Sequence, residues 1–163
     1  NRLLSMGDTF FVETMSFKGL QKRSKKTEKN EKGRFKKKKR FGRTLSNRAP
    51  AMLLSCLERK LKYHGLKLKK VNTAKVKASQ YNHVDDTYTK KTLNKRWHDF
   101  GGIKVQRDLY SSFLLMNMVD DKNLDKIDRD LCFKTFDLFL QHHDELISKL
   151  KKEPHTLKSM GIR

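Results

Sequence analysis

The strongest constraint on what this chain can fold into is a basic run at residues 18–43, which holds fourteen Lys or Arg residues and two Glu residues. Side chains of one charge repel each other and are costly to bury, so such a run cannot enter a packed core. It predicts a solvated segment, and the core must come from the residues on either side. Phe35 and Phe41 interrupt the run and are suited either to stacking on bases or to packing against a neighbouring domain.

The whole chain shares this basic character. Its 163 residues include 39 Lys or Arg and 18 Asp or Glu, which gives a formal net charge of +21. This charge draws the chain toward polyanions, and nucleic acid is favoured because phosphate binding releases condensed counterions. The residues predicted to contact nucleic acid are Lys18, Lys22, Arg23, Lys25, Lys26, Arg34, Lys36, Lys37, Lys38, Lys39, Arg40, Arg43 and Arg107.

Other partners are less favoured. An anionic membrane would require a lipid anchor or a basic amphipathic helix with an apolar face, which the run lacks. No stretch approaches the roughly 18 apolar residues of a membrane span, and the N-terminus has no signal-peptide core. Cys56 and Cys132 lie far apart, which argues against a disulfide scaffold and a CxxC metal site. The sequence favours a protein of the reducing cytoplasm that binds DNA or RNA, and it leaves the oligomeric state open.

Apolar periodicity predicts strands and helices in alternation, which is the α/β pattern. The expected elements are a buried strand at 8–12, a helix at 46–64, a strand at 66–71, and helices at 106–119 and 130–152. Ser46 or Asn47 is suited to cap the first helix, with Pro50 in its first turn. The stripes expected to be buried are Leu53, Leu54, Leu57 and Leu61 in the first helix, and Val105, Leu109, Phe113 and Met116 in the second.

Glu13 and Asp108 are the candidate catalytic and metal-binding residues. Glu13 closes the first strand, and Asp108 lies inside the helix at 106–119. If that helix crosses the end of the sheet, the two carboxylates converge, and converging carboxylates favour Mg²⁺ or Mn²⁺ between them. Two such ions can activate a water and stabilise the leaving oxygen in phosphodiester cleavage. Taken alone, Glu13 is better explained as a solvated strand end.

Several motifs, in order, resemble a known family. Ala78-Ser79-Gln80 and the stretch at 106–113 resemble the T-S-Q segment and the third RuvC motif of TnpB-type proteins. These are transposon-encoded, RNA-guided relatives of type V Cas nucleases. The stretch at 11–20 resembles their second RuvC motif, with its strand-ending Glu. The resemblance covers residues 8–119, and the order of the elements is more specific than any one motif.

The resemblance implies an RNase H-like (RuvC) domain in which three acids hold the metal ions. Glu13 and Asp108 match the second and third acids, while the first Asp, expected upstream, has no match before Glu13. The implied complete protein is a bacterial, nucleoid-associated DNA endonuclease that uses Mg²⁺ or Mn²⁺ and binds guide-type RNA, and this chain is either a fragment of it or the product of a truncated gene. We expect the chain by itself to be inactive. The implied divisions are a partial RuvC-like domain at 1–119, a basic loop at 18–45, a zinc-ribbon-like insertion at 73–103, and a helical extension at 120–163.

The insertion departs from the family pattern. The resemblance implies paired cysteines, yet the stretch at 73–103 contains none. His83 and His98 alone cannot complete a tetrahedral zinc site, so zinc is not expected. We expect the segment to be held instead by packing around Trp97. A histidine pair completed by Asp85 or Asp99 is the less favoured alternative.

The sequence also supports an alternative function and interpretations of Arg107 and of two neighbouring histidines. A non-catalytic basic protein, such as a degenerate transposon remnant, would also bind RNA or DNA through its charge. Arg107 lies next to Asp108, where it is suited to contact the scissile phosphate or an acidic neighbour. His142 and His143 are interpreted as a polar patch on the third helix rather than as a metal site.

Overall fold

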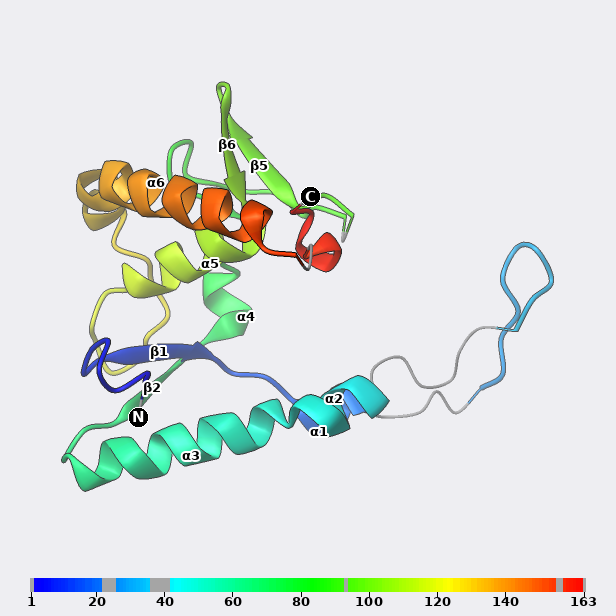
Figure 1. Cartoon of the computed structure of the whole chain (residues 1–163), viewed down its shortest axis with the longest axis horizontal. Helices are drawn as coiled ribbons and strands as arrows, with labels where there is room; N and C mark the ends of the chain where they lie inside the picture. The colour runs from blue at the N-terminus through cyan, green and yellow to red at the C-terminus, as the bar shows by residue number, and fades with distance from the viewer. Residues whose placement is uncertain (1, 22–25, 36–41, 93, 155–156, 163) are drawn as a thin grey trace. The chain divides into compact units, whose positions relative to one another are not determined.

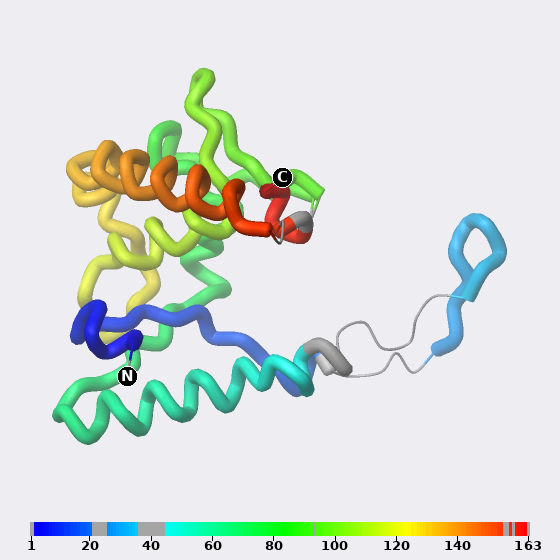
Figure 2. The backbone as a smooth tube through the Cα atoms, viewed as in Figure 1, coloured from blue at the N-terminus to red at the C-terminus, as the bar shows by residue number. Residues whose placement is uncertain are grey.

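The computed structural model describes residues 2–21, 26–35, 42–92, 94–154 and 157–162 (Figures 1 and 2). It divides the chain into two compact units. Unit 1 comprises residues 1–10 and 14–68, and unit 2 comprises residues 11–13 and 69–163. The described elements combine helices with three two-stranded sheets, so the expected α/β class is confirmed in its general form.

Unit 1 is helical. Its helices are α1 (Phe17–Gln21), α2 (Gly42–Arg48) and α3 (Pro50–Tyr63). The single helix predicted at 46–64 is wrong at its start, because Ala49 adopts a left-handed conformation (φ 41°) that separates α2 from α3. Pro50 then opens α3, where its missing N–H has no intrahelical partner to lose.

The predicted apolar stripe of this helix is only half buried. Leu57 and Leu61 are buried, whereas Leu53 is 57% exposed. Ser46 and Asn47, expected as caps, lie within α2 instead, and the residue before α3 makes no side-chain cap.

Unit 2 begins with a small sheet. β1 (Phe10–Glu13) pairs with β2 (Leu68–Val71), and the two strands cross the boundary between the units by one residue each. The strand expected at 8–12 therefore begins and ends slightly later, so Glu13 is its last residue. All four residues of β1 are partly buried rather than fully covered.

The stretch at 72–103, where the sequence predicted no helix or strand, contains regular structure. Its elements are α4 (Thr73–Val76), β3 (Tyr81–Asn82), β4 (Thr87–Tyr88) and β5 (Trp97–Phe100), followed by β6 (Ile103–Gln106). β3 pairs with β4 and β5 pairs with β6, both antiparallel. Gly101 and Gly102 form the second turn with φ of 62° and 102°, a conformation that side chains disfavour.

Two helices complete unit 2. They are α5 (Arg107–Met116) and α6 (Arg129–Lys152), and they lie alongside each other in Figure 1. A short 3-10 helix, η1 (Lys158–Met160), follows α6. α6 confirms the helix predicted at 130–152, and Asp128 caps it by accepting the Leu131 N–H at 2.9 Å.

The core of unit 2 gathers around α5. Buried side chains come from β2, α4, β6 and both helices, including Val71, Val76, Val105, Phe113 and Cys132. The stripe predicted for α5 is partly wrong, because Met116 is 60% exposed and the buried face is Tyr110, Phe113 and Leu114. The division suggested between residues 119 and 120 falls inside this unit, since α6 supplies Cys132 to the same core. Among the described helices, none is long and apolar enough to cross a bilayer.

Candidate functional site

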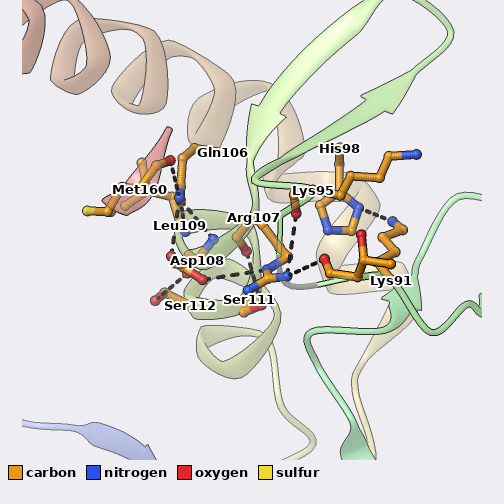
Figure 3. A network of polar contacts seen from close by, with 11 residues as sticks. Lys91, Lys95, His98, Gln106, Arg107, Asp108, Leu109, Ser111, Ser112 and Met160 are labelled. Carbon is orange, nitrogen blue, oxygen red and sulfur yellow. Dashed lines mark hydrogen bonds and ion pairs between the residues drawn. The ribbon is translucent and has the colours of Figure 1, made fainter. Parts of the chain in front are cut away.

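Asp108 lies in the first turn of α5, and the residue that holds it there is Gln106 (Figure 3). The Gln106 side-chain oxygen accepts the backbone N–H groups of Asp108 at 2.7 Å and Leu109 at 2.9 Å. Its Nε2 donates to the Asp108 carboxylate at 3.3 Å and to the Met160 carbonyl at 3.2 Å. Gln106 is fully buried, while the Asp108 side chain is 48% exposed. The buried amide thus fixes a carboxylate that solvent and ligands can reach.

The backbone of Gln106 is also tied to α6. Its N–H donates to Nε2 of His143 at 3.0 Å, and Nδ1 of His143 lies 2.8 Å from the Asp144 carboxylate. Because Nε2 accepts, the ring hydrogen belongs on Nδ1, where it donates to Asp144. The prediction of a polar surface patch is wrong for His143, which is 3% exposed, and right for the exposed His142.

Arg107 points away from open solvent. Its side chain is 11% exposed, and Nη1 donates to the carbonyls of Thr92 and Lys95, both at 3.4 Å. Its backbone N–H donates to the Arg96 carbonyl at 2.9 Å, and Nε lies 3.7 Å from the Asp108 carboxylate (Figure 3). Arg107 therefore anchors the segment before β5 to the start of α5, beside the acidic neighbour that the sequence suggested.

Glu13 is the second candidate acid and ends β1. The residue is partly buried, and burial raises the pKa of its carboxyl group above the ordinary value. The cause is the loss of water around the carboxyl group, which disfavours its charged form.

The two acids belong to the same unit but lie on different elements. Among the described residues, no hydrogen bond or ion pair joins Glu13 to Asp108, and no group of three or more His, Cys, Asp or Glu side chains is arranged to hold a metal ion. Carboxylate oxygens are the ligands that Mg²⁺ prefers, so the donor chemistry fits. The number of donors is incomplete.

The basic run is seen in part. Lys18 is exposed on α1, and Lys26 and Arg34 are exposed on a turn that the Asn30 side chain closes. The Lys29 ammonium lies 5.2 Å from the ring centre of Phe35, which is 69% exposed rather than packed on a domain. Arg43 lies in α2. The predicted contacts outside the described residues are Lys22, Arg23, Lys25, Lys36, Lys37, Lys38, Lys39 and Arg40, together with the aromatic Phe41.

The zinc-ribbon-like segment has two buried histidines at its centre. His83, in the turn after β3, is 0% exposed, and His98 on β5 is 2% exposed. Nδ1 of His83 lies 2.7 Å from the Tyr110 hydroxyl, and Nδ1 of His98 faces the Lys91 ammonium (Figure 3). Nε2 of each ring is buried without a hydrogen-bond partner. Burial lowers the pKa of both imidazoles from 6.5 to about 4, with Arg129 adding to the effect on His83 and Lys91 to that on His98.

These histidines are packing residues in this arrangement. His98 stacks on Phe100 with ring centres 5.8 Å apart, and His83 meets Phe136 edge-on at 4.7 Å. The carboxylates proposed as additional ligands are used in their own turns. Asp85 accepts the Asn82 amide and Asp99 accepts the Gly102 N–H, both at 2.7 Å.

Trp97 was predicted to be the packing centre of this segment, but the structure has the packing centre at other residues. The aromatic cluster forms around Phe100, Tyr110, Phe113 and Phe136. Trp97 lies at its margin, partly buried, and its indole N–H donates to the Gly161 carbonyl.

Comparison of the chain with models of protein families, with curated proteins and with solved structures found no match in any of the three. The class of protein is therefore argued from its residues and their arrangement. The arrangement is an α/β unit that presents a positioned, half-exposed carboxylate, within a strongly basic chain.

Proposed function

We propose that this chain is the C-terminal part of a TnpB-like, RuvC-type DNA endonuclease with an RNase H-like domain, guided by RNA and acting in the bacterial cytoplasm at the nucleoid. The observation that carries the proposal is the support of Asp108. A fully buried amide, Gln106, holds both the backbone and the carboxylate of a residue whose side chain remains half-exposed. Rigid support of a reachable acid is the arrangement that metal-dependent cleavage requires.

Glu13 and Asp108 would hold the catalytic ions in the complete protein. When bound, Mg²⁺ or Mn²⁺ would activate the attacking water and stabilise the leaving oxygen of a phosphodiester. Gln106 orients the Asp108 carboxylate through Nε2, and the start of α5 favours negative charge at that position. Burial raises the pKa of Glu13, and a cation bound beside it would favour the charged carboxylate.

The basic run would hold the nucleic-acid backbone. Exposed cations of the run, such as Lys18, Lys32 and Arg34, are suited to phosphate contacts that position the nucleic acid without reading its sequence. DNA is the proposed substrate, and guide-type RNA is the proposed partner.

The test is Mg²⁺-dependent cleavage of DNA by the chain, with and without the segment encoded upstream. We expect no cleavage by the chain alone, because Glu13 and Asp108 match two of the three acids that the resemblance implies, and no residue before Glu13 matches the first. We expect cleavage when an upstream strand supplies the missing Asp, and its loss in Asp108→Ala. Asp137→Ala, at an exposed position on α6, is the matched control. Strong cleavage that survives Asp108→Ala would refute the proposal.

The second candidate function is non-catalytic binding of RNA or DNA through charge. It is supported by the net charge of +21 and by the lack of a three-acid group among the described residues. Under this function Glu13→Gln and Asp108→Asn leave binding unchanged, and no metal-dependent activity arises with the upstream segment present. A steep salt dependence is expected for both functions and does not distinguish them.

A further inference from the structure

Unit 2 contains a basic cavity whose lining includes neither Glu13 nor Asp108. It lies beside the β5–β6 hairpin and the last turns of α6, and its volume is about 890 Å³. Ligand sites in proteins commonly measure about 300–1,000 Å³. The lining residues that matter here are Lys95, Arg96, Trp97, Lys104, His143 and Lys151.

Trp97 forms a fixed aromatic wall of this cavity. Its Nε1 donates to the Gly161 carbonyl at 3.0 Å, and its ring meets His143 edge-on at 89° and 6.1 Å. Gly161 has a φ of 74°, and a Cβ there would lie 2.8 Å from Cβ of Arg96 and 3.1 Å from Nε1 of Trp97. The close approach of Gly161 holds the indole in one place, so a ligand that stacks on it orders little additional side chain.

The charge of the cavity is positive. Four cations line it, at Lys95, Arg96, Lys104 and Lys151, against the two acids Asp99 and Asp144. Both acids are hydrogen-bonded to close neighbours in the chain, Asp99 to the Gly102 N–H and Asp144 to His143. The three lysines are exposed, so their ammonium groups are available to phosphate at the rim.

We propose that this cavity binds a segment of single-stranded nucleic acid, with a base against Trp97 and the flanking phosphates on the lysines. Aromatic side chains in a basic groove are the usual platform for unpaired bases. A duplex does not offer a free base face, because its bases are stacked and paired. The site requires neither Glu13 nor Asp108, so it goes beyond the nuclease proposal and is independent of it.

Trp97 also provides the measurement, since it is the one tryptophan in the sequence. The full chain is titrated without Mg²⁺ with an oligothymidylate of about ten nucleotides, within the range of known single-strand sites. Emission from Trp97 reports occupancy of the cavity, and the anisotropy of a labelled oligonucleotide reports total binding. We expect oligothymidylate to quench Trp97, and an abasic phosphodiester of the same length to bind without quenching.

Variants separate the cavity from general charge. In the double variant Lys104→Glu with Lys151→Glu, the oligonucleotide concentration needed for half-maximal quenching should rise by about tenfold or more, because phosphate contacts are lost. Lys122→Glu with Lys134→Glu makes the same charge change at exposed positions of unit 2 outside the cavity, and it should leave most of the quenching in place. Trp97→Phe should cost less affinity than Trp97→Ala, which should lose about tenfold by anisotropy. Thermal unfolding confirms that each variant folds.

Three outcomes would overturn the proposal. They are binding by anisotropy with no change in Trp97 emission, quenching of equal size by the abasic phosphodiester, and equal loss in the two charge-reversal pairs. Failure of the nuclease proposal gives a different result, namely an inactive protein in which Trp97 is still quenched.

Discussion

Cations gather both on the turn at residues 26–35 and in the cavity beside the β5–β6 hairpin, but the backbone that carries them differs between the two places. In the turn, Lys29 contacts an exposed phenylalanine, and the turn is closed by local hydrogen bonds of Asn30. In the hairpin, the backbone carries buried His98 and Val105 into a core, while Lys104 remains outside. Exposed cations on a locally closed turn therefore predict only contact with a polyanion. Cations on a backbone that is fixed by a packed core predict a binding site of defined geometry.

The same contrast separates binding from stability. Replacing exposed cations of the turn should change affinity and leave unfolding nearly unchanged. Replacing the buried residues of the hairpin should instead lower the free energy of unfolding.

Acid should destabilise unit 2 more than any single replacement. The pKa of His83 and His98 is about 4 in the folded chain and 6.5 ordinarily, so the unfolded chain binds more protons between these values. Their contribution to stability is complete above pH 6.5, falls as the pH drops through this window, and falls no further below about pH 4. Each pKa unit is worth about 1.4 kcal/mol, so the two rings together amount to several kcal/mol.

Urea unfolding at a series of pH values measures this loss. His98→Phe should reduce the slope within the window, because one titrating ring is removed from the core. Gln141→Ala, at an exposed position on α6, removes no titrating group and is the control that should leave the slope as it is. A free energy of unfolding that stays flat from pH 6.5 to 4 would contradict the buried, neutral histidines.

Gln106→Leu should be the most damaging replacement near the candidate site. It removes the acceptor of the Asp108 and Leu109 N–H groups and the donor to the Met160 carbonyl. Loss of an N-cap costs about 1 kcal/mol, and a buried group left without a partner costs about 1–3 kcal/mol. We expect a loss of about 3 kcal/mol by urea unfolding. Gln141→Leu, exposed on α6, should stay within about 0.5 kcal/mol, and an equal effect at both positions would exclude the proposed support.

The sequence predicts elements well where the determining residues are local. The helix at 130–152 has an acid before it, apolar residues at helical spacing and Pro154 after it, and it was found at Arg129–Lys152. Ala49 shows the limit of such patterns, because the break between α2 and α3 lies at a residue that normally favours helix. The hairpins of 72–103 were missed because their strands of two to four residues lack a continuous apolar run such as the one in β1.

The candidate site was predicted in part. Motifs single out Glu13 and Asp108 as candidates, but the support of Asp108 depends on partners far along the chain. Gln106 meets His143 and Met160, which lie 37 and 54 residues later. The signal present in the sequence was a Gln directly before the helix, a position where a side-chain acceptor satisfies free N–H groups. Nothing local indicated that the same residue is fully buried.

Gly161→Ala should loosen the contact between the C-terminal segment and Trp97. The substitution combines strain at a φ of 74° with a Cβ only 2.8 Å from Cβ of Arg96, and we expect a loss of about 1–3 kcal/mol. Gly101→Ala is the control for strain alone, since its φ is 62° and nothing lies within 4 Å of its Cβ. Thermal unfolding measures the loss, and a shift in Trp97 emission should accompany Gly161→Ala and not Gly101→Ala. Identical emission from the two variants would show that the indole is not held by this contact.

The smallest effect on stability is expected from the basic turn. Lys32 and Arg34 are exposed, so Lys32→Gln and Arg34→Gln should each change the free energy of unfolding by less than about 0.5 kcal/mol. Each should nonetheless weaken nucleic-acid binding and lower the slope of log K against log salt by about 1, because one phosphate contact is removed. Anisotropy over a salt series measures both quantities. A variant that unfolds easily would place the turn within a packed core, and an unchanged slope would show that its charges are not at the interface. Either result would remove the distinction between the turn and the hairpin, since the turn would then behave as part of a core or as a surface without a partner.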